Sequence, residues 1–129
     1  MDVVNAMTFH FEIEVSVLQA LCYCLYEMKH YGRIKFIEYD TDFGTRDMGQ
    51  KLREKILVLI NSNDKVVLDF TGVNVVSNSF ADECIAKLLL EIPLDELKRR
   101  TTFRGLNSLA ERSVLVALQR RYKVLHDKL

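Results

Sequence analysis

Two serines in the stretch VVSNSFADE, residues 75–83, are the side chains of this sequence best placed for regulated chemistry. Ser77 and Ser79 lie where an apolar run gives way to a helical pattern, and Asp82 and Glu83 follow within about one helical turn. A hydroxyl at such a position can accept a phosphoryl group, which adds about −1.5 to −2 charges at pH 7. It can instead cap the helix, with Ser79 as N-cap and Asp82 three residues later, for about 1 kcal/mol. The sequence alone leaves both alternatives open.

Three further side chains are candidates for contact with a nucleotide or its phosphates. Thr45 and Arg46 stand at the predicted start of one helix, and Asp69 lies near the end of the strand that follows it. Strand ends and helix N-termini form the ligand crevice of parallel α/β domains, so these residues could meet Ser79 there. A nucleotide-binding domain that uses this crevice is therefore one hypothesis for the chain.

The remaining reactive side chains do not form a catalytic or metal-binding motif in the sequence. The histidines lie in different predicted elements without ligand spacing, and the chain has neither a P-loop nor the G-x-S-x-G motif. The triplet DFG at 42–44 matches a protein kinase motif only by its letters, because the other kinase motifs are missing. We expect no catalytic residue, no metal site and no cofactor, and we interpret the histidines as surface or satisfied side chains: His10, His30 and His126.

Composition and charge narrow the class of partner. The chain has 129 residues, with 18 basic and 18 acidic side chains. The basic residues are spread thinly, without the interleaved aromatic residues of single-strand binders, which argues against nucleic acid. No apolar stretch reaches the ~18 residues of a membrane span. An odd number of cysteines favours free thiols in a reducing compartment, so we expect a cytoplasmic protein with buried thiols at Cys22, Cys24 and Cys84.

Strand and helix patterns alternate along the chain. Period-two alternation and short β-branched runs predict strands at 9–17, 33–39, 65–70 and 101–104, with a further short apolar run at 73–76. Apolar residues at helical spacing predict helices at 18–30, 46–60, 80–92 and 108–125, with Thr45 and Ser108 as caps. Residues 40–45 are interpreted as a polar turn, and 94–100 as a connection or a single turn. This order predicts one small α/β domain, with a mainly parallel or mixed four-stranded sheet and helices packed on it.

The runs LDF, VNVV and SNSFA within residues 68–81 resemble the STAS family (sulphate transporter and anti-sigma-factor antagonist domains). Together with DFGTRDMGQKLREKI at 42–56, they are most similar to its bacterial STAS-like subgroup of unassigned function. The resemblance covers residues 33–122. It implies a STAS-like domain at 33–129, preceded by a strand–helix extension at 1–32 that packs on the same domain.

The family's functional residues can be carried over by position. Its aspartate falls on Ser77, its first hydroxyl residue on Asn78, its phosphorylated serine on Ser79 and its glycine on Phe80. The resemblance implies a non-catalytic regulatory module that binds a protein partner, such as an ATPase-type serine kinase, and is switched at Ser79, with Ser77 as a second candidate.

The same helix start is where we expect the partner to bind. The expected contacts are Asn78, Phe80, Asp82 and Glu83, with Phe80 adding bulk beside the site. The two acidic side chains should repel a phosphate on Ser79. A homodimer through residues 18–31, where tyrosines lie on or near an apolar helix, is a further hypothesis.

Overall fold

The computed structural model describes residues 30–127 of the chain. Its strands and helices alternate, as the sequence predicts. In chain order they are β1 (Tyr31–Lys35), the 3-10 helix η1 (Phe36–Glu38), β2 (Asp42–Phe43), α3 (Arg46–Ser62), β3 (Lys65–Asp69), β4 (Val75–Val76), α4 (Asn78–Cys84), the 3-10 helix η2 (Ala86–Leu90), α5 (Leu94–Arg100), β5 (Thr101–Arg104) and α6 (Ser108–Asp127).

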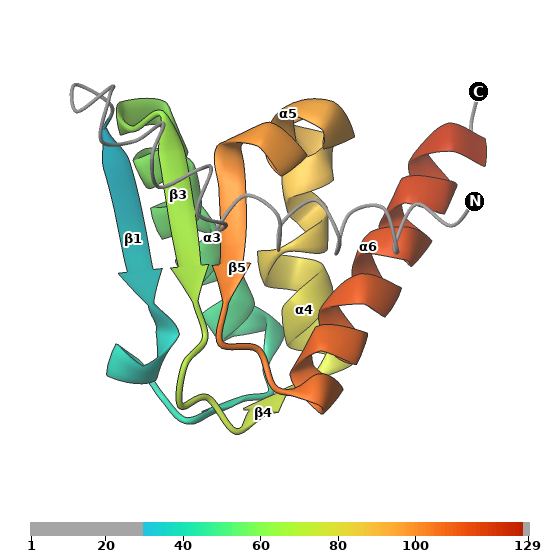
Figure 1. Cartoon of the computed structure of the whole chain (residues 1–129). Helices are drawn as coiled ribbons and strands as arrows, with labels where there is room; N and C mark the ends of the chain where they lie inside the picture. The colour runs from blue at the N-terminus through green and yellow to red at the C-terminus, as the bar shows by residue number, and fades with distance from the viewer. Residues whose placement is uncertain (1–29, 128–129) are drawn as a thin grey trace.

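The main sheet has three parallel strands in the order β1-β3-β5. The central strand β3 is buried along its whole length, which explains its nearly continuous apolar sequence. A smaller parallel pair joins β2 to β4, with Phe43 opposite Val76. Figure 1 shows α3 and α4 behind the main sheet, with α6 beside α4 and α5 at the end of the sheet where β5 begins. The predicted α/β class with a parallel sheet covered by helices is confirmed, although the described strands form a sheet of three and a pair.

Four phenylalanines fill the core at the carboxyl ends of the strands. Phe36 stacks on Phe70 with ring centroids 3.9 Å apart, and Phe43 lies 4.8 Å from Phe80. Their side chains are fully buried and come from four separate segments of the chain. Aromatic rings bury a large apolar area, so this cluster holds η1, β2 and the start of α4 against the end of β3.

The long helix α3 is capped at both ends. At its start, the Thr45 hydroxyl accepts the backbone N–H of Met48 at 3.3 Å, as predicted. At its end, the Arg100 guanidinium donates to the backbone oxygens of Ile60 and Asn63. A cation at a helix C-terminus also interacts favourably with the helix dipole. These contacts tie α3 to α5, which ends at Arg100.

Several predicted boundaries are wrong, each for a tertiary reason. The strand predicted at 33–39 ends at Lys35, because Phe36 turns inward onto Phe70. The predicted polar turn at 40–45 contains β2, whose Phe43 is buried. The helix predicted at 80–92 divides near Ile85 into α4 and η2.

Two further corrections concern the last third of the chain. The expected connection at 94–100 is the helix α5, directly after Pro93. The cap of α6 is Asn107, whose side-chain oxygen accepts the N–H of Ala110 at 2.8 Å, whereas Ser108 is already helical. The strand β5 has the predicted bounds.

The predicted strand at 9–17 and nearly all of the helix at 18–30 lie outside the described residues. The extension at 1–32 and the homodimer through 18–31 therefore stay predictions. Among residues 30–127, no helix is both long and apolar enough to cross a membrane.

Candidate functional site

The first turn of α4 separates the roles of the two serines. Ser77 is extended (φ −73°, ψ 160°), and its Oγ accepts the backbone N–H of Phe80 at 3.0 Å. Its carbonyl accepts the N–H of Ala81 at 2.9 Å. Ser77 is therefore the N-cap, and the prediction that Ser79 caps this helix is wrong by two residues. The cap falls earlier because β4 ends at Val76 and Asn78 is already helical.

Ser79 has no structural role in the described part of the chain. It lies in the first turn of α4, it is exposed, and its hydroxyl has no hydrogen-bond partner among residues 30–127. Asn78 is exposed beside it. An exposed hydroxyl next to a helix start can be reached by another protein, whereas the Ser77 hydroxyl is already used.

Phe80 does not lie on the surface. Its side chain is 0% exposed and packs against Phe43 and Phe36. The expectation that Phe80 is presented to a partner and adds bulk beside Ser79 is therefore wrong. At helix position N3 the residue points into the core, so the phenylalanine that replaces the family's glycine fills an internal space.

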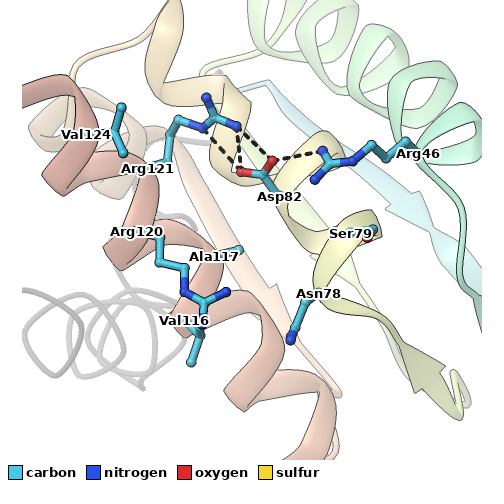
Figure 2. A pocket seen from close by; sticks show the side chains of 9 residues that line it. All are labelled: Arg46, Asn78, Ser79, Asp82, Val116, Ala117, Arg120, Arg121 and Val124. Atoms are coloured by element: carbon cyan, nitrogen blue, oxygen red, sulfur yellow. Dashed lines mark hydrogen bonds and ion pairs between the residues drawn. The ribbon is translucent and has the colours of Figure 1, made fainter.

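Asp82 lies between two arginines from different helices, as Figure 2 shows. The Arg121 Nη2 atom lies 2.9 Å from Oδ1 and 2.7 Å from Oδ2 of Asp82, and the Arg46 Nη1 atom lies 2.9 Å from Oδ2. Burial by itself would raise the pKa of this carboxyl, but hydrogen bonds from Arg121 and Arg46 outweigh burial and leave the pKa below its usual value. Asp82 is therefore ionised and joins α3, α4 and α6.

Glu83 is held still more tightly on the side of α4 that faces α3. Its carboxylate pairs with Arg53 at 2.8 Å, with Lys87 at 2.9 Å and with Arg46 at 3.1 Å. Arg53 also donates to the Glu83 backbone oxygen. Although burial opposes ionisation, hydrogen bonds from Lys87, Arg53 and Arg46 lower the pKa of Glu83 to about 2. Since Glu83 is only 7% exposed, it is inside the α3–α4 contact and is not presented to a partner as expected.

A pocket of about 350 Å³ opens between the first turns of α4 and the second half of α6. Asn78, Ser79 and Asp82 form its α4 side, and Arg46 reaches it from the start of α3. The α6 side combines an apolar wall with two guanidinium groups: Val116, Ala117, Val124, Arg120 and Arg121. Three guanidinium groups therefore face one carboxylate, so the pocket carries a positive excess.

The predicted phosphate-contact residues are only partly brought together. Arg46 lines the same pocket as Ser79. Thr45 caps α3, and Asp69 accepts the backbone N–H of Thr71 at 3.0 Å at the end of β3. Neither of these two side chains lines the pocket. Within residues 30–127, no group of three or more His, Cys, Asp or Glu side chains could hold a metal ion.

Arg120 and Arg121 are the charged pocket residues that sequence reasoning did not single out. In the sequence, both belong to the thinly spread basic residues that are expected on solvated helix faces. A usable signal did exist, because Arg121 continues the buried stripe of Val114 and Leu118 at helical spacing. An arginine on the inward face of a helix indicates a carboxylate on the neighbouring element.

The fold and this helix start define a small parallel α/β domain with an exposed serine in the first turn of a short helix. Residues 48–110 match the model of a family described as a STAS-like domain of unknown function. The resemblance to a STAS-like domain inferred from the sequence is therefore confirmed over residues 48–110. The matched segment includes nearly all of α3, all of α4 and the start of α6. No curated protein matches the chain, and no solved structure does.

Proposed function

We propose that this protein is a non-catalytic regulatory module that binds a protein partner through the surface around Ser79, and that phosphorylation of Ser79 switches this binding. The observation that carries the proposal is that the two serines have different roles. Ser77 caps α4, so Ser79 can be modified without loss of the cap. The STAS-like family match supports the regulatory class.

The partner surface combines features of protein-binding sites. Asn78 and Ser79 are exposed at the rim of the pocket, and Val116 and Val124 offer apolar area within it. Arginine is enriched at protein interfaces, and Arg46 and Arg120 are both exposed here. The partner would be an ATPase-type serine kinase, the class that the STAS resemblance implies. Cys84 is a free, buried thiol, which suits the reducing cytoplasm where we place the protein.

The test is a pull-down from lysate of the source organism, with intact-mass measurement of the recovered protein. Binding of a kinase and a mass increase of one phosphate, lost in Ser79→Ala, are the expected results. Ser108→Ala is the matched control, because Ser108 is also exposed in the first turn of a helix. Phosphate that persists in Ser79→Ala, or equal partner recovery with and without the phosphate, would contradict the proposal.

Nucleotide binding is a second candidate, favoured by one observation. The pocket of about 350 Å³ has guanidinium groups beside an apolar wall, and small-molecule sites start at about 300 Å³. Arg46 and Ser79 would then contact phosphate, whereas Thr45 and Asp69 would not. Isothermal titration with ATP and GTP tests it, and no heat at millimolar nucleotide would exclude it.

A further inference from the structure

We propose that the arginines of the α4–α6 pocket bind the phosphate of phosphorylated Ser79 within the same molecule, so that phosphorylation closes the pocket. This inference rests on the proposed function, because it describes what the modified serine does. In the modification itself, the Ser79 Oγ attacks the γ-phosphorus of ATP, the bond to the β-phosphate oxygen breaks, ADP leaves, and the hydroxyl proton passes to the kinase.

The charge of the pocket is suited to this anion. Its charged lining consists of Arg46, Arg120 and Arg121 against Asp82, an excess of two positive charges. A phosphoserine carries about −1.5 to −2 charges at pH 7, so it would come close to neutralising that excess. Guanidinium groups also match phosphate geometry, since they donate two parallel N–H bonds.

The acidic neighbours of Ser79 oppose a phosphate less than the sequence indicates. Asp82 is already paired with Arg121 and Arg46, and Glu83 is paired with Arg53, Lys87 and Arg46. Their negative charges are therefore balanced before any phosphate arrives, and the repulsion expected from the bare sequence is offset.

Two of the three arginines are free to turn toward a new anion without leaving a carboxylate unpaired. Arg120 is exposed and makes no ion pair with the described part of the chain. The Arg46 side chain is 52% exposed, and both of its carboxylate partners keep other cations if it turns to the phosphate. Arg121 can stay on Asp82. A phosphate bound by Arg46 and Arg120 would connect α3, α4 and α6 across the mouth of the pocket.

Closure of this kind gives the switch a physical basis. The unmodified pocket presents arginines and an apolar wall to a partner. The phosphorylated pocket would use the same arginines internally and cover the wall. The partner would then lose the cationic groups as well as the space, in addition to meeting a new negative charge.

The test uses the full chain with phosphoserine incorporated at position 79, followed by a phosphorus NMR titration. Arginines within a few ångströms favour the dianion, so the second pKa of the phosphate should fall by about one unit from its value near 6 in a short peptide of residues 76–82. Arg46→Gln and Arg120→Gln should each move it back toward the peptide value. Arg112→Gln is the matched control, an exposed arginine of α6 outside the pocket.

A phosphate pKa equal to or above the peptide value would overturn the inference. So would an Arg120→Gln variant that titrates like Arg112→Gln. Thermal unfolding provides a second readout, because internal binding should raise the melting temperature of the phosphorylated chain and Arg120→Gln should remove the increase. The test needs neither kinase nor partner, so loss of partner binding with an unshifted phosphate pKa would leave the proposed function standing while this inference fails.

Discussion

Arg121 on α6 holds both carboxylate oxygens of Asp82 on α4, with its Nη2 atom 2.9 Å from Oδ1 and 2.7 Å from Oδ2. The two residues are 39 positions apart in the sequence. Their contact attaches the C-terminal helix to the helix that presents Ser79 and forms one side of the arginine-lined pocket. The position of Ser79 relative to α6 therefore depends on an ion pair between distant segments.

Removing this carboxylate should weaken the attachment of α6. Asp82→Asn keeps the shape of the side chain but loses its charge-assisted hydrogen bonds, each worth about 1.5–3 kcal/mol. We expect the free energy of unfolding to fall by about 2 kcal/mol, measured by urea denaturation. Asp127→Asn, at the exposed end of α6, is the control and should change little. Equal stability of the two variants would show that the Asp82 pairs contribute nothing.

Acid should destabilise the fold through Glu83. Its pKa is lowered from 4.5 to about 2 in the folded chain. The folded state therefore binds this proton less readily than the unfolded state, so the stabilisation is present above the unfolded value of 4.5 and is lost as the pH falls toward 2. Urea midpoints measured between pH 7 and pH 2 should fall in that window, and less steeply in Glu83→Gln. Parallel pH profiles for the two proteins would contradict this assignment.

The two serines should differ in how much their truncation costs in stability. Ser77→Ala removes the hydroxyl that accepts the Phe80 N–H, at a cost of about 1 kcal/mol of unfolding free energy. Ser79→Ala should change stability by less than about 0.5 kcal/mol, because an exposed side chain without partners is replaced. Chemical denaturation of both variants measures the difference. A larger loss for Ser79→Ala would mean that Ser79 has a structural role.

Truncating Phe80 should strongly destabilise the protein, because its side chain belongs to the core. Phe80→Ala leaves a cavity beside Phe43 and Phe36, and such changes cost about 3–5 kcal/mol. We expect a large fall in melting temperature, measured by circular dichroism. Val75→Ala, an exposed apolar position just before the cap, is the control. A Phe80→Ala variant as stable as Val75→Ala would place the ring outside the core.

Local patterns in the sequence were enough to predict most of the elements. The strands β3 and β5 and the helix α3 have their own hydrophobic periods, and Thr45 provides a local cap. The residues of the α4 start could also be predicted, because the run through SNSFA resembles a STAS domain and residues 48–110 match that family model. These features depend on residues close together in the chain.

The roles within the α4 start were decided only by the tertiary structure. Whether Ser77 or Ser79 caps the helix depends on where β4 ends after pairing with β2. Phe80 is buried because Phe36 and Phe43, from other segments of the chain, pack against it. Asp82 and Glu83 resemble free surface charges in the sequence, yet arginines from α3 and α6 neutralise them. Packing between distant helices sets these contacts, and a local pattern of residue types does not contain that information.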